Sequence, residues 1–154
     1  MDLNQRFDDL LNVKFVSHNV LRINCNTWGD GLLRDLTRST RDLLKSNEPI
    51  VLALQEVLSW KSKSIGGFRI WTDTSCDCAI LVPSNFAHFV RSTFFGDRYF
   101  GVVLGRFVVV SVHLIRDGRI AENTLVDISW EFNAVQSRFR NETFALLIGI
   151  DANV

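Results

Sequence analysis

Five strand-length apolar segments follow one another between residues 68 and 114, and their spacing constrains the fold more than any other feature of the sequence. They are FRIWT, CAILV, FAHFV, YFGVVLG and RFVVVSVHL, separated by the turn-like SCD, PSN, FGD and Gly105. Strands spaced this closely favour antiparallel hairpins. The middle of the chain is therefore expected to be a run of short antiparallel strands.

Helix-like and strand-like patterns alternate on either side of this region. The pattern VLRINCN at 20–26 alternates as in a half-buried strand, and leucines near helical spacing predict a helix over 31–46. The continuous apolar run IVLALQ at 50–55 is typical of a strand covered on both faces. Residues 121–140 show helical spacing, and FALLIGI at 144–150 predicts a final buried strand. This order indicates an α/β or α+β layered sandwich.

The composition is that of one globular domain. The 154 residues are 47% hydrophobic and 22% charged, which excludes a disordered or fibrous chain. The first residues, MDLNQRFDDLL, lack the apolar core of a secretory signal, and the stretch 99–114, interrupted by Arg106, is too short to span a bilayer. We therefore expect a soluble intracellular protein without membrane contact, with nuclear and cytoplasmic locations and the oligomeric state left open.

Two further counts limit the chemistry. Seventeen Lys and Arg balance seventeen Asp and Glu, so the large positive excess of a simple nucleic-acid binder is missing. Contact with nucleic acid would then depend on a local site or a bound cation. The cysteines Cys25, Cys76 and Cys78 do not form a common zinc pattern and are expected to be reduced, buried or half-buried thiols.

Polar side chains stand at the ends of the apolar strands. Asn26 ends the first, Glu56 follows IVLALQ, His113 nearly ends RFVVVSVHL, and Asp151 and Asn153 follow FALLIGI. Catalytic and ligand-binding groups commonly collect where strands end and loops begin. Oxygen ligands of this kind suit a hard cation such as Mg²⁺ or Mn²⁺.

Each of these residues alone has a simpler explanation. A Glu after a strand is usually a solvated strand end, and an Asn before Gly29 is usually a turn residue. The hypothesis of a site depends on the combination and its order.

Several motifs together resemble the endonuclease/exonuclease/phosphatase superfamily. They are NTWG at 26–29, PIVLALQE at 49–56, CAILVP at 78–83, VVVSVHL at 108–114 and LLIGIDANV at 146–154. The LQE and IGIDAN strings look closest to retrotransposon endonucleases. The resemblance covers residues 20–154, and residues 1–19 would be an N-terminal extension.

The resemblance implies a four-layer α/β/β/α sandwich of the deoxyribonuclease-like type, C-terminally truncated, and a Mg²⁺-dependent or Mn²⁺-dependent phosphodiesterase acting on nucleic acid, most readily DNA. It implies that Glu56 is the main metal ligand with Asn26 beside it, and that Asp151 orients or activates the attacking water. Asn153 would orient the scissile phosphate, and His113 would contact the phosphate.

This sequence also departs from the family pattern. Asn19, in SHNV, is an alternative to Asn26 as the first-strand asparagine, and Ile150 replaces the usual Gly before Asp. The family domain continues to an Asp-His pair that these residues lack, so the chain alone is expected to be weakly active or inactive. A phosphatase or lipid phosphodiesterase on the same scaffold is one alternative function, and a catalytically silent remnant or binding module is another.

Overall fold

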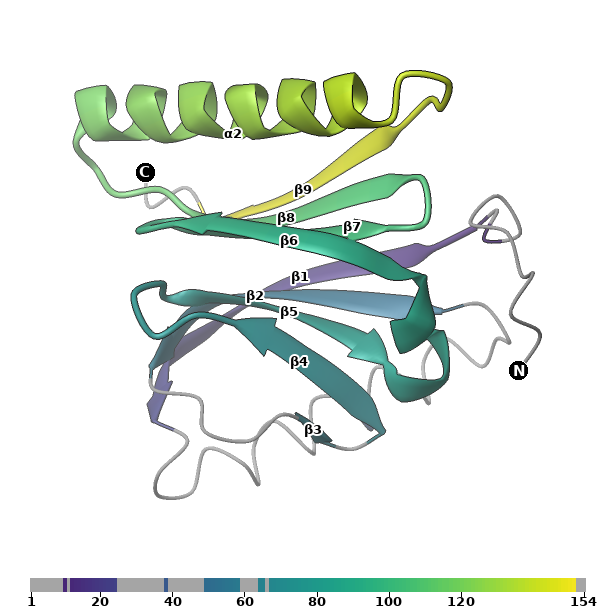
Figure 1. Cartoon of the computed structure of the whole chain (residues 1–154). Coiled ribbons are helices and arrows are strands. Elements are labelled where there is room, and N and C mark those ends of the chain that lie inside the picture. The colour runs from purple at the N-terminus through teal and green to yellow at the C-terminus, as the bar shows by residue number, and fades with distance from the viewer. Residues whose placement is uncertain are drawn as a thin grey trace.

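The computed structural model describes residue 10 and residues 12–24, 38, 49–58, 64–65 and 67–151. Within these residues the chain forms two β-sheets stacked face to face, and a long helix covers the outer face of one of them (Figure 1). Both sheets contain parallel and antiparallel pairs. The fold is therefore of the α+β type, as the order of patterns in the sequence predicts.

The five-stranded sheet has the order β1-β2-β5-β4-β3. Its strands are β1 (Lys14–Asn24), β2 (Ile50–Leu58), β3 (Ser64–Ile65), β4 (Phe68–Thr72) and β5 (Cys78–Pro83). β1 and β2 are parallel, whereas β2, β5, β4 and β3 pair antiparallel. The antiparallel pairing of β4 with β5 confirms the first of the expected hairpins.

The four-stranded sheet has the order β6-β7-β8-β9. Its strands are β6 (Val90–Gly96), β7 (Tyr99–Leu104), β8 (Phe107–His113) and β9 (Ala145–Asp151). β6, β7 and β8 form antiparallel hairpins, and β9 is parallel to β8. The connection between these parallel strands contains helix α2 (Gly118–Arg138), because parallel neighbours need a long crossover.

Helix α2 begins at a capping residue and packs by its apolar stripe. The side chain of Asp117 accepts hydrogen bonds from the backbone N–H groups of Arg119 and Ile120 at 3.0 and 3.2 Å, which satisfies two donors that the first turn leaves unpaired. Ile128 and Val135 are 2% and 1% exposed against the four-stranded sheet. Helix α2 is not apolar enough to cross a membrane, nor is any other helix in the described residues.

The apolar core lies in layers on both faces of each sheet. Between the sheets lie Val51, Ala53, Ile80 and Val82 on one side and Phe100, Val102, Leu104 and Val109 on the other. Between the four-stranded sheet and α2 lie Val103, Val108, Val110, Val112, Ile128 and Val135. The outer face of the five-stranded sheet carries a third buried cluster, which includes Leu52, Leu54, Val57, Phe68 and Leu81. The central strand β2 is thus buried on both faces, as its continuous apolar run predicts.

The first of the expected strands has different bounds. The first strand begins at Lys14 rather than at residue 20 and ends at Asn24, so residues 14–19, expected to be an extension, pair with β2. β1 lies at the edge of its sheet, so its residues 14–19 are only partly buried or exposed. The polar residues Ser17, His18 and Asn19 interrupt the apolar alternation there, so the sequence pattern did not indicate a strand.

The prediction of a strand at FAHFV is wrong. Residues Ser84–Phe89 form a 3₁₀ helix, η2, and the strand β6 follows it. The physical reason is topological: β5 belongs to one sheet and β6 to the other, so the chain must turn between them. Phe89, 4% exposed, fills the core at this turn.

The last strand is less buried than expected. β9 is an edge strand of the four-stranded sheet, and its Leu146 and Ile150 are 37% and 44% exposed. The helix expected over 31–46 lies outside the described residues except for Arg38.

Candidate functional site

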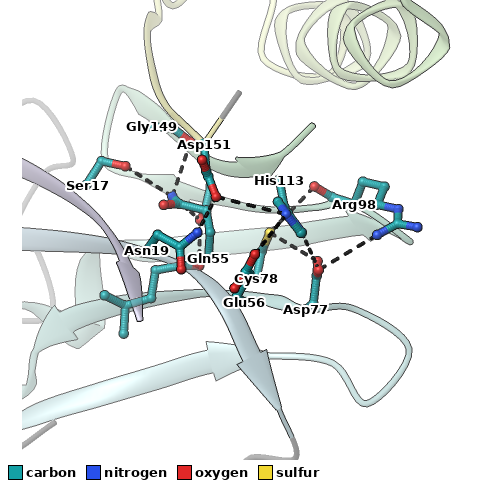
Figure 2. A network of polar contacts seen from close by, with 12 residues as sticks. Ser17, Asn19, Gln55, Glu56, Asp77, Cys78, Arg98, His113, Gly149 and Asp151 are labelled. Atoms are coloured by element: carbon teal, nitrogen blue, oxygen red, sulfur yellow. Dashed lines mark hydrogen bonds and ion pairs between the residues drawn. The ribbon is translucent and has the colours of Figure 1, made fainter. Parts of the chain in front are cut away.

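The space between the two sheets changes from apolar to polar toward one end. β1 runs parallel to β2, and β8 runs parallel to β9. β8 and β9 end there, at His113 and Asp151, while β2 and β1 continue to Leu58 and Asn24. Beyond the apolar cluster, the inward-facing positions of these strands are Ser17, Gln55, Ser111 and Gly149. The next side chains on the same side, toward the carboxyl end of each strand, are Asn19, Glu56, His113 and Asp151 (Figure 2).

Gln55 joins the two sheets in the polar layer. Its side chain is buried to 1% exposure, and its Nε2 donates to Ser111 Oγ at 2.9 Å, to Ser17 Oγ at 3.0 Å and toward the Gly149 carbonyl oxygen at 3.3 Å. The Ser111 hydroxyl in turn donates to the Leu54 carbonyl oxygen at 2.7 Å. A buried amide is stable only when its donors are satisfied, so these contacts fix the relative positions of β1, β2, β8 and β9.

Glu56 reaches the inner face because the backbone bulges there. Along β2, Val51 and Ala53 face the other sheet while Leu52 and Leu54 face outward, so strict alternation would turn Glu56 outward and Val57 inward. Instead Val57 belongs to the outer cluster, and Glu56 has a φ of 58°, in the left-handed region. The pairing of β1 with β2 shifts register at the same place. This bulge keeps Glu56 on the same side as Gln55.

His113 lies between two carboxylates. Its Nε2 is 3.4 Å from Oε1 of Glu56 and 3.9 Å from Oδ2 of Asp151, and one ligand atom from each of the three residues lies within 4.8 Å of the other two. Their side chains are 9%, 16% and 21% exposed in the order His113, Glu56 and Asp151. The imidazole is thus nearly buried, and the two carboxylates are partly exposed.

The other ring nitrogen of His113 is held by Asp77, just before β5. Nδ1 lies 2.6 Å from Asp77 Oδ2. Because an ionised carboxylate can only accept, Nδ1 carries the proton of this bond and Nε2 faces the two other carboxylates. The guanidinium of Arg98 lies 3.9 Å from the same Asp77 oxygen. Asp77 therefore fixes the orientation of the imidazole.

Asn19 contacts the site from the edge strand. Its side-chain amide donates to Oδ2 of Asp151. The contact joins the middle of β1 to the carboxyl end of β9, one strand from each sheet, and is drawn in Figure 2. An amide donor orients a carboxylate and satisfies one of its lone pairs, so Asn19 helps to set the direction of Asp151.

A divalent cation fits the chemistry of this cluster. An acceptor Nε2 facing two carboxylate oxygens is electrostatically unfavourable unless a proton on Nε2 or a cation among the three groups offsets the negative charge. Carboxylate oxygens are the usual protein ligands of Mg²⁺ and Mn²⁺, and imidazole is also accepted by transition metals. Glu56, Asp151 and His113 could hold such an ion, and the structure does not identify which metal.

Two buried thiols flank Asp77. Cys76 and Cys78 are free and buried, as expected for these two cysteines. The hydrogen bond from the Cys78 thiol lowers the pKa of Cys76, and the same bond together with burial raises the pKa of Cys78 well above its usual range. Cys25 lies outside the described residues.

The structure brings together three of the five residues singled out in the sequence. These are Glu56, His113 and Asp151. Asn26 and Asn153 lie outside the described residues, and Asn19, the alternative to Asn26, contacts Asp151. Sequence reasoning missed Asp77. The available signal was its place just before β5, because an antiparallel strand starts at the edge where β2 ends.

Comparison with models of known protein families gives no match, and no curated protein matches the sequence.

Proposed function

We propose that this chain is a metal-dependent phosphodiesterase that cleaves nucleic acid, an endonuclease of the retroelement type within the endonuclease/exonuclease/phosphatase superfamily. The observation that carries the proposal is the cluster of Glu56, His113 and Asp151. These residues come from β2, β8 and β9 of two different sheets and still place their ligand atoms within 4.8 Å of one another. Such convergence at the carboxyl ends of strands is the usual position of a catalytic site.

The proposal includes the four-layer sandwich of that superfamily. α2, the four-stranded sheet and the five-stranded sheet supply three layers (Figure 1). The outer face of the five-stranded sheet carries fully buried side chains, such as Leu54 and Phe68, each 0% exposed. An apolar face of this kind is what a fourth layer covers.

In this proposal Glu56 and Asp151 hold Mg²⁺ or Mn²⁺. When bound, the cation supplies positive charge that neutralises a phosphate and polarises its phosphorus. This also explains how a chain of zero formal net charge can act on a polyanion. Asp151, oriented by the amide of Asn19, is in addition the carboxylate that orients a water molecule.

His113 acts through Nε2. Asp77 holds the proton on Nδ1, so Nε2 is the nitrogen that can donate a proton to a phosphate oxygen or accept one. Nε2 lies 3.4 Å from a carboxylate oxygen of Glu56 and 3.9 Å from one of Asp151, which supports a role for His113 in contacting a phosphate beside the cation.

Calorimetric titration of the chain with Mg²⁺ and Mn²⁺ tests the metal ligands. Glu56→Gln keeps the size of the side chain and removes its charge, and it is expected to weaken binding by about tenfold or more. Glu122→Gln, on the exposed side of α2, is the matched control and keeps wild-type affinity. Equal affinity of Glu56→Gln and wild type would remove Glu56 from the site.

Nicking of supercoiled plasmid in Mg²⁺ tests the reaction. Nicking by this chain is expected to be weak, to need the metal and to be lost in Asp151→Ala, since a positioned base or acid contributes about 10²–10⁴-fold. Single-stranded DNA, RNA and a small phosphomonoester, assayed in parallel, distinguish a nuclease from a phosphatase. Metal binding without turnover on any of these substrates would instead favour a binding module.

A further inference from the structure

A second cluster of candidate metal ligands lies on the other side of His113. One ligand atom from each of Cys76, Asp77 and Cys78 lies within 4.8 Å of the other two. Cys76 and Cys78 alternate with Asp77 at the start of β5, and both thiols are buried, at 8% and 0% exposed. Two sulfurs and a carboxylate at this separation can bind one ion together, because a metal ion brings its ligand atoms within about 4 Å of each other at Zn–S and Zn–O bond lengths of about 2.0–2.3 Å.

The atoms around the two sulfurs are predominantly acceptors. The Cys76 thiol is 3.2 Å from the Tyr99 carbonyl oxygen, and the Cys78 thiol is 3.5 Å from the Arg98 carbonyl oxygen and 3.6 Å from Oδ1 of Asp77. The backbone N–H of Cys78 points at the sulfur of Cys76 at 3.4 Å. Without a metal, these oxygens accept from the two S–H groups, so a bound ion would have to replace both thiol protons. The same oxygens would then stabilise the positive charge of the ion, and the Cys78 N–H would stabilise the thiolate of Cys76.

The turn before the cluster is already formed. Asp73 Oδ1 accepts hydrogen bonds from the backbone N–H and the hydroxyl of Ser75 at 2.9 and 2.6 Å, and Cys76 N–H donates to the Asp73 carbonyl oxygen at 3.0 Å. Cys78 is held in β5 opposite Gln55. Because both cysteines are fixed by the backbone, an ion would not have to order them.

We propose that Cys76, Asp77 and Cys78 form a second metal site, selective for a thiophilic divalent ion such as Zn²⁺. The two clusters differ in ligand hardness: sulfur dominates this one, and oxygen dominates the cluster of Glu56 and Asp151. The Asp77 carboxylate serves both, since Oδ1 faces Cys78 and Oδ2 binds Nδ1 of His113 (Figure 2). An ion at the sulfur site therefore acts on the imidazole through the carboxylate that orients it.

Titration of the reduced 154-residue chain with Co²⁺ or Cd²⁺, followed by thiolate-to-metal charge-transfer absorption, tests the site. We expect saturation at one ion per chain, and displacement of the Co²⁺ signal by Zn²⁺. Cys76→Ser and Cys78→Ser should each weaken binding by more than about tenfold. Cys25→Ser should leave it unchanged, as should Glu56→Gln and Asp151→Asn, which separates this site from the one in the proposed function.

X-ray absorption of the wild type loaded with one equivalent of Zn²⁺ tests the site even if a cysteine variant fails to fold. Two sulfur neighbours are expected. A Zn²⁺ shell of nitrogen and oxygen alone would overturn the proposal, and so would an unchanged charge-transfer signal in folded Cys76→Ser/Cys78→Ser. Absence of any charge-transfer signal in the wild type would overturn it as well.

Discussion

Oε1 of Glu56 lies 3.4 Å from Nε2 of His113, and a left-handed backbone conformation at Glu56 makes this possible. The φ of 58° is one that L side chains adopt at a cost of about 1–2 kcal/mol. The strained backbone therefore belongs to the residue that supplies a carboxylate to the cluster. Strain at such a position is commonly part of a functional site.

Glu56→Gly and Glu56→Ala together measure this strain. Both remove the carboxylate, but only glycine accepts a positive φ without steric penalty. Chemical denaturation is expected to show Glu56→Gly more stable than Glu56→Ala by about 1 kcal/mol. Equal stability, or a more stable alanine variant, would argue against a bulge at this residue.

Removal of the buried amide in the polar layer should destabilise the fold. Gln55→Leu takes away the donor to Ser17, Ser111 and Gly149, and it is expected to lower the free energy of unfolding by about 1–3 kcal/mol. In Gln55→Leu/Ser111→Ala the loss should be smaller than the sum of the two single losses, because both residues share one hydrogen bond. Strict additivity would show that this bond contributes nothing.

Gly149 of β9 lies against Ser17 of β1, and a side chain there should not fit. A Cβ added at Gly149 would lie 2.5 Å from Oγ and 2.7 Å from Cβ of Ser17. Gly149→Ala is therefore expected to cost about 1–3 kcal/mol of stability. Ser17→Gly in the same chain should recover part of the loss, since Ala53 Cβ would remain at 3.1 Å. A Gly149→Ala variant as stable as wild type would contradict this.

Tyr99 gives a prediction in alkaline solution. Burial between the four-stranded sheet and α2, followed by the charges of Glu131 and Asp127, raises the pKa of Tyr99 to about 12. Because the pKa in the folded chain exceeds the unfolded value near 10, stability is complete below about pH 10 and falls as the pH rises toward 12. The sequence contains one tyrosine, so tyrosinate absorbance reports this group alone. Native protein should titrate near 12 and denatured protein near 10; the same midpoint for both would contradict the burial of this phenol.

Much of the architecture could be predicted because apolar patterns report burial directly. The run IVLALQ predicted a strand buried on both faces, and β2 has Leu54 facing outward and Ala53 facing inward with both fully buried. The segment FAHFV misled for the same reason: it is apolar because Phe89 enters the core at a crossing between sheets. A pattern reports burial but does not state which element buries a side chain.

The candidate site was predictable only in part. Glu56, His113 and Asp151 could be selected because each interrupts or ends an apolar run. The bulge that turns Glu56 inward could not, since its positive φ has no glycine to signal it. Asp77 looked like a turn residue, and its contact with His113 depends on an antiparallel pairing that places the start of β5 beside the ends of β2 and β8.

The hydrogen bonds of Gln55 also bear on how the chain reaches its final form. Its partners Ser17, Ser111 and Gly149 lie 38, 56 and 94 residues away along the chain. Forming contacts between residues so far apart in the sequence costs the entropy of closing large loops. We therefore expect them to form after the local hairpins. The strands that this amide joins also carry Glu56, His113 and Asp151. During refolding, the candidate site is therefore expected to be among the last features to appear, after β6, β7 and β8 have paired.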